Sequence, residues 1–194
     1  MKIYGIIPAR KGSKRLPHKN IRTINNKTLI EYAIEEAKKS KYINDIFISS
    51  DDPVVLKIGK KYGLKERDRP RELATDTATS QEVVDDLDLW IPHDHKPDFY
   101  VLLQPTSPLR KAKHIDKCIE TYIKGSFESV ISVKEIAPYV YYPNGAVYVF
   151  KDKIYTKNMG FILMDRESSL DIDTYEDFRL ARYYMESKND RNDR

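Results

Sequence analysis

The sequence has a single cysteine, Cys118, among its 194 residues. One cysteine excludes a disulfide within the chain, so we expect a cytosolic protein or one that is indifferent to redox conditions. Cys118 lies at an apolar position of a helical pattern, "HIDKCIETYI". This position favours a buried structural thiol over a nucleophile.

Long hydrophobic runs are also lacking. No apolar stretch approaches the roughly 18 to 20 residues of a membrane span, and the first residues do not form the apolar core of a signal peptide. We therefore expect a cytoplasmic protein with no membrane partner. The end of the chain, residues 188–194, has no apolar residue and is expected to be a frayed tail.

A strong charge imbalance is absent as well. The chain has 34 Lys and Arg against 30 Asp and Glu, which gives a net charge of +4. Because the two signs are interspersed, the sequence does not predict a nucleic-acid partner. The basic excess is local, and it is densest from Arg10 to Lys19.

Apolar runs that predict strands alternate with amphipathic runs that predict helices. The expected strands are residues 2–8, 45–51, 98–104, 129–133 and 145–150. The expected helices are residues 28–40, 53–63, 80–91, 112–124 and 174–187. This order predicts an α/β fold, a single three-layer domain with a mostly parallel, Rossmann-like sheet. No repeat or composition shift marks a second domain, so residues 1–187 are assigned to one domain.

Four polar segments lie just after predicted strands or in connecting loops: "IPARKGSK", "SSDD", "LLQPTSPLR" and "SLDIDT". Ligands of α/β sheets bind beyond the carboxyl ends of the strands. We therefore expect these four segments to converge on one edge of the sheet.

The stretch "IPARKGSKRLPHKN" has neither the P-loop pattern nor the dinucleotide-binding glycine pattern. Gly12 and Ser13 allow backbone N–H groups to approach an anion, while Arg10, Lys14 and Lys19 supply positive charge. Taken alone, the stretch fits a phosphate-binding loop and a solvated basic loop equally well.

Asp171 and Asp173 stand two residues apart, so in an extended segment their side chains share one face. Two carboxylates opposite a basic loop suit a Mg²⁺ that is also held by substrate phosphates. The alternative is that Asp173 caps the helix that starts near Thr174.

Three other segments allow both local and functional interpretations. In "RPRELATDTATSQEVV", Arg69 and Ser80 are candidates to read a base edge, whereas Asp76 and Thr77 equally suit local caps. "LLQPTSPLR" offers the polar side chain of Gln104 but also reads as a rigid turn. "YYPNGAVYVF" predicts a turn first and a substrate contact second.

Six motifs in this order, "IPARKGSKRLPHKN", "SSDD", "RPRELATDTATS", "LLQPTSPLR", "PNGAVY" and "SLDIDT", resemble the acylneuraminate cytidylyltransferase family. This family includes the CMP-sialic acid synthetases and bacterial nonulosonate relatives. The resemblance runs from Ile3 to about Tyr184. Kdo cytidylyltransferases have a similar opening loop, but "LATDTATS" and "DIDT" fit the acylneuraminate side better. The resemblance implies a nucleotide-diphospho-sugar-transferase-like domain.

The resemblance also implies roles for individual residues. The contacts to the CTP phosphates and ribose are Arg10, Ser13, Lys14, Lys19 and Asn20. The positions near the cytosine are Arg69 and Ser80, and the substrate contacts are Gln104, Asn144 and Tyr148. The Mg²⁺ ligands are Asp171 and Asp173, and the residues expected to take part in catalysis are Arg10, Lys19 and Asp173.

The implied reaction transfers CMP from CTP to a hydroxyl of an acidic sugar and releases pyrophosphate. Fixed Arg and Lys side chains with Mg²⁺ would stabilise the charge on the leaving group. One departure from the family lies between "VISVKEI" and "YYPNGA", where this chain has a few residues and the family has several tens that swap across a dimer. Tyr142 also replaces a common Arg.

The shortened acceptor side leaves three functions open. The first is a cytidylyltransferase for a sialic-acid-like or other nonulosonate sugar. The second is a cytidylyltransferase for a smaller acceptor, such as another keto sugar acid or a phosphonate. The third is a nucleotide-binding module without catalysis. Because the missing extension usually forms the dimer, we expect a monomer or a weak homodimer.

Overall fold

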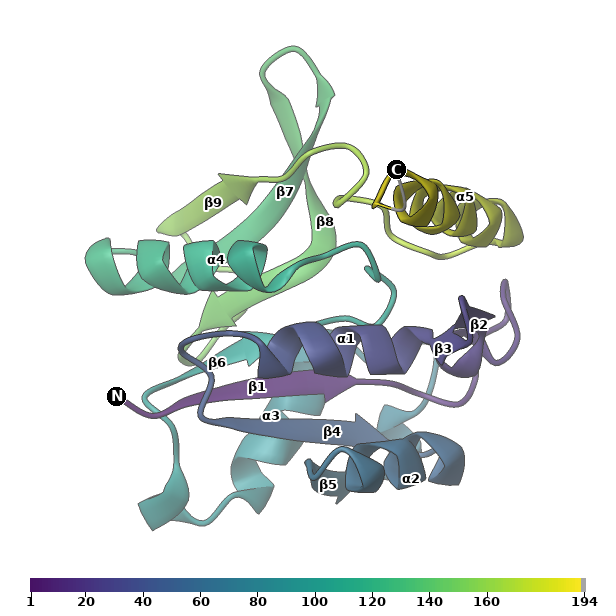
Figure 1. The fold of residues 1–194 in the computed structure, drawn as a ribbon. Coiled ribbons are helices and arrows are strands. Elements are labelled where there is room, and N and C mark those ends of the chain that lie inside the picture. Colours follow the sequence, from purple (N-terminus) through teal and green to yellow (C-terminus); the bar gives the residue numbers. More distant parts are fainter. Residues whose placement is uncertain (193–194) are drawn as a thin grey trace.

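The computed structural model describes the backbone of residues 1–192 and the side chains of residues 1–187. Helices cover both faces of a seven-stranded sheet (Figure 1), so the predicted three-layer α/β domain is confirmed. The strands of the sheet are β1 (Ile3–Pro8), β4 (Asp45–Ser50), β5 (Lys65–Asp68), β6 (Phe99–Leu102), β7 (Ser129–Ala137), β8 (Val140–Phe150) and β9 (Met159–Leu163). A small hairpin is formed by β2 (Thr23–Ile24) and β3 (Lys27–Thr28).

The α-helices that connect or follow these strands are α1 (Leu29–Lys38), α2 (Pro53–Lys61), α3 (Ser80–Trp90), α4 (Ala112–Lys124) and α5 (Tyr175–Asn192). Short 3₁₀ turns are η1 (Lys19–Ile21), η2 (Arg71–Leu73) and η3 (His93–His95). None of the described helices is both long and apolar enough to cross a membrane.

The strand order is β5-β4-β1-β6-β8-β7-β9. The pairs β5/β4, β4/β1, β1/β6 and β7/β9 are parallel, whereas β8 runs antiparallel to both of its neighbours. The sheet is therefore mostly parallel, as predicted. Since β8 is reversed, its beginning lies at the same edge as the carboxyl ends of the other six strands.

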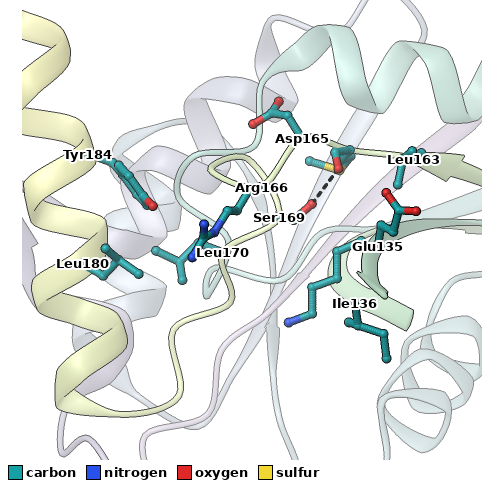
Figure 2. A pocket seen from close by; sticks show the side chains of 11 residues that line it. Glu135, Ile136, Leu163, Asp165, Arg166, Ser169, Leu170, Leu180 and Tyr184 are labelled. Carbon is teal, nitrogen blue, oxygen red and sulfur yellow. Dashed lines mark hydrogen bonds between the residues drawn. The ribbon is translucent and has the colours of Figure 1, made fainter. Parts of the chain in front are cut away.

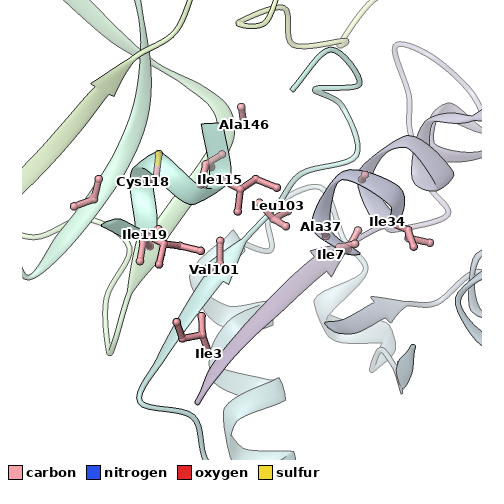
Figure 3. Packing of buried hydrophobic residues seen from close by; sticks show 14 of the residues in the cluster. Ile3, Ile7, Ile34, Ala37, Val101, Leu103, Ile115, Cys118, Ile119 and Ala146 are labelled. Carbon is pink, nitrogen blue, oxygen red and sulfur yellow. The ribbon is translucent and has the colours of Figure 1, made fainter. Parts of the chain in front are cut away.

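Alternation along β1 divides the core into two layers. Ile3 and Ile7 join the cluster that α1, α2 and α4 cover, while Tyr4 and Ile6 join the cluster beneath α3. Figure 3 shows the first cluster, where Cys118 packs among aliphatic side chains. The thiol is free and buried, as predicted, and burial raises its pKa to about 12. A thiol with this pKa is a poor nucleophile at neutral pH.

Local signals define where the helices begin. Thr28 and Thr79 each form a capping box with the Glu three residues later, at the starts of α1 and α3. Asp52 caps α2 by accepting a hydrogen bond from Val54 N at 2.9 Å, and Pro53 occupies the first turn.

The structure differs from the sequence prediction at the edges of the sheet. The strands β5 and β9 were not predicted, and β7 and β8 form a longer hairpin that closes at Tyr139 (φ 63°). The helix α5 continues to Asn192, so most of the expected tail at 188–194 is helical; residues 193–194 lie outside the described residues.

Candidate active site

A cavity of about 350 Å³ lies at the carboxyl edge of the sheet. Most of the predicted site residues line it: Arg10, Ser13, Lys19, Asn20, Arg69, Ser80, Gln104, Asp171 and Asp173. They come from the loop after β1, the loop between β5 and α3, the turn after β6 and the segment before α5. Three of the four segments expected to converge on this edge, "IPARKGSK", "LLQPTSPLR" and "SLDIDT", therefore line the cavity, whereas "SSDD" does not.

The loop after β1 is braced at both ends. Asn20 is buried, and its Nδ2 donates to the Arg10 carbonyl oxygen at 2.9 Å. Lys11 N donates to Asp51 Oδ1 at 2.7 Å, and the Ser50 hydroxyl donates to the carbonyl oxygen of Ala9. "SSDD" therefore supports the loop after β1. These hydrogen bonds fix the loop, unlike a loop that contacts only solvent.

Asp76 binds two cations of this loop. Its Oδ1 lies 2.6 Å from Arg10 Nη1, and its Oδ2 lies 2.5 Å from Lys14 Nζ. Hydrogen bonds from Lys14 and Arg10 lower the pKa of this carboxyl. Asp76 thus binds Arg10 at the position where a substrate anion would bind it. Lys14 pairs with Asp76 and does not line the cavity.

Lys19 connects the loop to the segment before α5. Its side chain is only 14% exposed, and Nζ donates to the Ile172 carbonyl oxygen at 2.9 Å and to Asp173 Oδ1 at 3.0 Å. Arg15 Nη2 donates to Asp173 Oδ2 at 2.9 Å. Burial opposes ionisation of Asp173, but Lys19 and Arg15 outweigh it and lower its pKa. Arg15 was missed because a long exposed side chain gives no pattern in the sequence.

The segment Asp171–Asp173 has the predicted alternation. Both carboxylates line the cavity, while Ile172 is fully buried in a third cluster with Leu16 and Phe178 of α5. Ile172 N donates to the Thr106 carbonyl oxygen at 2.8 Å, which fixes the segment against the turn after β6.

Helix α5 is capped by Thr174, one residue after Asp173. Thr174 N donates to Asp177 Oδ2 at 2.8 Å, and Asp177 N donates to Thr174 Oγ1 at 3.2 Å. The alternative in which Asp173 serves as the cap is therefore wrong, and both of its oxygens face cations instead.

Asp171 is a buried carboxyl with an unused oxygen. Burial raises its pKa, although the Thr106 hydroxyl and the charge of Lys19 act in the opposite direction. Its Oδ1 is buried and has no hydrogen-bond partner among the described residues. A buried acceptor without a partner is costly, so its presence here indicates a site that is completed by a ligand.

Two carboxylates are too few to hold a metal ion by protein ligands alone, but they suit a Mg²⁺ ion that a substrate also binds. No group of three or more His, Cys, Asp or Glu side chains suited to a metal occurs in the part of the chain that the structure describes. Mg²⁺ is usually held by one or two carboxylates together with water and substrate phosphates. The Oδ1 of Asp171 is available as one such ligand, whereas Asp173 would join it by exchanging a contact with Lys19 or Arg15 for the metal.

Arg69 lines the same cavity as this pair. It is only 6% exposed, and its Nη2 and Nε donate to the carbonyl and hydroxyl oxygens of Ser49 at 2.7 and 3.2 Å. Burial lowers its pKa to about 10, so it remains a cation at neutral pH. The first turn of α3, including Ser80, lies beside it along the cavity. This part of the cavity combines a fixed cation with the N–H groups of a helix start.

The turn after β6 is held by a buried arginine. Arg110 is 1% exposed, and its Nη1 donates to the carbonyl oxygens of Gln104 and Ala146 at 2.9 and 2.8 Å. These bonds join the turn that carries Gln104 to the reversed strand β8. "LLQPTSPLR" is thus a rigid turn that also presents a cavity residue.

Gly145 allows that turn and Asp171 to approach β8 closely. Its φ is +76°, and a Cβ at this position would lie 2.6 Å from Gln104 Oε1 and 3.3 Å from Asp171 Oδ2. The left-handed backbone therefore favours glycine, and a Cβ here would also displace the end of the Gln104 side chain.

Asn144 and Tyr148 do not line the cavity. Asn144 is buried, accepts a hydrogen bond from Ser132 Oγ at 2.6 Å and donates one to Ser169 Oγ at 3.1 Å. Tyr148 is 6% exposed in the cluster beneath α3, and burial, with Tyr155 nearby, raises its pKa. Asn144 also accepts a hydrogen bond from Ala146 N at 3.1 Å, while Tyr148 packs its ring against Tyr155.

The comparisons with known proteins agree with this architecture. The cytidylyltransferase family model matches residues 4–189. The chain is 32% identical over 217 residues to the N-acylneuraminate cytidylyltransferase of Streptococcus agalactiae serotype V, covering 92% of this chain and 52% of that protein. The chain thus spans about half the length of several of the curated relatives that it matches.

A relative of similar length is the CMP-N,N'-diacetyllegionaminic acid synthase of Legionella pneumophila, with 32% identity over 227 residues, 96% of this chain and 97% of that protein. An alignment longer than the 194 residues of this chain means that the relative has residues without a counterpart here.

Among solved structures, a CMP:2-keto-3-deoxy-manno-octonic acid synthetase complexed with CTP has a TM-score of 0.76 at 15% identity, covering 97% of this chain and all of that one. At that identity the likeness supports the fold alone. The family model and the curated relatives confirm the resemblance found in the motifs: the chain belongs to the cytidylyltransferase family, and it is similar to the acylneuraminate cytidylyltransferases.

Proposed function

We propose that the protein is a Mg²⁺-dependent cytidylyltransferase that transfers CMP from CTP to a hydroxyl of an acidic, nonulosonate-like sugar and releases pyrophosphate. The observation that carries the proposal is the ion pair between Lys19 and Asp173, together with the buried Oδ1 of Asp171, which has no hydrogen-bond partner among the described residues. Curated relatives that act on N-acylneuraminate and on diacetyllegionaminic acid support the acceptor class.

The cavity supplies the groups that this reaction needs. Arg10 and Lys19, with the backbone around Ser13, would bind the triphosphate and stabilise the charge that grows on the leaving pyrophosphate. Arg69 and the first turn of α3 would bind the cytosine. The acceptor oxygen bonds to the α-phosphorus as the bond to pyrophosphate breaks, so alignment is the main task of the protein.

Asp171 and Asp173 would hold the metal, which when bound neutralises phosphate charge. The pKa of Asp173 is lowered in the presence of Lys19 and Arg15, which suits a permanently ionised ligand better than a proton acceptor. Asp173 therefore contributes to catalysis through charge.

A smaller acceptor is the second candidate, and the short β7–β8 hairpin favours it. The two strands are joined by Pro138 and Tyr139 alone, so no extension reaches out to a partner subunit from this point. A smaller keto sugar acid or a phosphonate needs fewer contacts on that side.

Pyrophosphate release from CTP tests the proposal. The acceptor panel contains N-acetylneuraminic, legionaminic and pseudaminic acids, Kdo and a phosphonate, and the mass of each product identifies the acceptor. We expect release only with Mg²⁺, preference for CTP over ATP, GTP and UTP, and the highest rate with a nine-carbon sugar acid. Tight CTP binding without release for any acceptor would favour the non-catalytic module.

A further inference from the structure

A second cavity, of about 840 Å³, lies farther along the same edge of the sheet, beyond β8. Figure 2 shows it between the inner face of α5, with Leu180 and Tyr184, and the end of β7, with Glu135 and Ile136. Its volume falls in the usual range for small-molecule sites. The larger cavity of the two is thus not the one that holds the predicted site residues.

One short segment separates the two cavities. Ser169 and Leu170 line the larger cavity, whereas Asp171 and Asp173 line the smaller one. The charge of Lys134, which also lines the larger cavity, offsets part of the rise that burial causes in the pKa of Asp171. A molecule in the larger cavity would therefore lie next to the predicted metal and triphosphate site.

The larger cavity has positive charge that the protein leaves unpaired. Lys134 and Arg166 line it, and neither side chain forms an ion pair or a hydrogen bond with another side chain or backbone group among the described residues. The two acids of the cavity are engaged: Glu135 Oε1 accepts from Tyr139 N at 3.2 Å, and Asp165 Oδ1 accepts from Ser168 N at 2.9 Å. Lys134 and Arg166 thus offer cationic donors in a cavity that also contains the Tyr184 hydroxyl and the carboxylates of Glu135 and Asp165. The two cationic donors suit the carboxylate of a ligand.

The remaining walls are apolar and partly exposed. Ile136, Leu163 and Leu180 are 58%, 50% and 40% exposed, although all three line the cavity. The wall at Ser169 is fixed from behind, because Asn144 Nδ2 donates to its hydroxyl oxygen at 3.1 Å. A ligand with both an anionic group and apolar substituents, such as N-acyl groups, matches this lining.

We propose that this cavity is the acceptor subsite, in which Lys134 and Arg166 of the same chain bind the carboxylate of an acyl-bearing sugar acid. The inference rests on the proposed function, because only that function requires an acceptor beside Asp171. In this chain Tyr142 stands directly before "PNGA", where related proteins commonly have Arg. The proposal gives the task of binding the acceptor carboxylate to Lys134 and Arg166 instead, without a residue from a partner subunit.

Calorimetric titration tests the subsite independently of turnover. N-acetylneuraminic, legionaminic and pseudaminic acids are each titrated into the wild-type protein and into Lys134→Ala, Arg166→Ala and the double variant. The matched control is Lys117→Ala, an exposed lysine on α4 that lines neither cavity. The methyl ester of the best-binding acid serves as a second probe.

We expect each single variant to weaken binding of that acid by about tenfold or more, as loss of a charge-assisted hydrogen bond does. The ester should bind weakly to every variant, and affinity for CTP and thermal unfolding should not change. Wild-type affinity in the double variant, equal binding of acid and ester, or no binding of any acid at millimolar concentration would overturn the inference.

Pyrophosphate release measured on the same proteins separates the two proposals. Acid binding that depends on Lys134 and Arg166, but without pyrophosphate release, contradicts the proposed function and leaves the subsite standing. Release with an unchanged acceptor KM in the double variant contradicts the subsite alone.

Discussion

Lys19 Nζ lies 3.0 Å from Asp173 Oδ1, although the two residues are 154 positions apart in the chain. The pair joins the basic loop after β1 to the acidic segment before α5. Each charge is partly buried, and such positions are costly unless the charges are paired or bind a ligand. The contact therefore accounts for both motifs: they face one site, and a metal-bound triphosphate would satisfy both.

Asp76 is expected to compete with the nucleotide for Arg10. Asp76→Asn removes the charge that holds Arg10 and Lys14, so the KM for CTP should fall roughly two- to fivefold, the scale of exposed ion pairs. Steady-state kinetics with varied CTP measures this. Asp94→Asn, which alters an exposed carboxyl in η3, is the control and should change nothing. A higher KM for CTP in Asp76→Asn would show that Asp76 helps to hold the substrate.

The Asp171 carboxylate is expected to lower the free energy of unfolding and to be needed for pyrophosphate release. Its pKa is raised by burial, so at neutral pH the folded state carries a disfavoured charge with an unpartnered oxygen. Asp171→Asn should unfold at the same or a higher temperature than the wild type at pH 7 while losing most pyrophosphate release.

The advantage of Asp171→Asn should shrink as the pH falls. A raised pKa means that the folded wild type binds the proton more tightly than the unfolded chain, so acid relieves the cost. Thermal unfolding from pH 7 to pH 4 follows the difference. A variant that is clearly less stable than the wild type at pH 7 would point to a structural carboxyl instead.

Gly145 is expected to be essential for the shape of the site. Gly145→Ala places a Cβ against Gln104 and Asp171 and strains a backbone with φ +76°, which should cost about 1 to 3 kcal/mol of unfolding free energy. Urea unfolding measures that cost. Gly12→Ala is the matched control, because no atom lies within 4 Å of its added Cβ and its φ is not positive. Equal stability of the two variants would refute the close-approach argument.

Arg110 is expected to fix the turn that carries Gln104. Arg110→Met removes the donor from the buried carbonyl oxygen of Ala146, at a cost of about 1 to 3 kcal/mol, and leaves the Gln104 carbonyl oxygen with only Ser107 N at 3.5 Å. Urea unfolding should show this loss, and the acceptor KM should rise as Gln104 becomes less ordered. The exposed Arg71 provides the control, since Arg71→Met should retain wild-type stability. An Arg110→Met protein with wild-type stability and normal kinetics would contradict the role of Arg110 in fixing this turn.

Much of this architecture follows from local patterns in the sequence. The strand β1 follows from the apolar run "KIYGIIP". The helix starts follow from capping residues close in sequence, which are Thr28, Asp52 and Thr79. The convergence of distant loops follows from the parallel sheet, because strand ends meet at one edge whatever lies between them.

The features that were missed depend on tertiary contacts. β5 is a polar edge strand, "KERD", which pairs with β4 alone among the described strands, and no apolar period marks it. Arg110 looks like a surface residue until its burial against two carbonyl oxygens is seen. The hydrogen bonds of Asn144 to Ser132 and Ser169 could not be predicted from its motif, and its role as a substrate contact stays a prediction.

The most direct test of the shared site is pyrophosphate release from CTP by Lys19→Ala. The matched control is Lys11→Ala, because Lys11 is an exposed lysine of the same loop that does not line the cavity. We predict that Lys19→Ala loses about 10²-fold or more in kcat, the scale for removing one preorganised donor to a transition-state charge, while Lys11→Ala stays near the wild type. A Lys19→Ala enzyme with near-wild-type turnover would contradict the account.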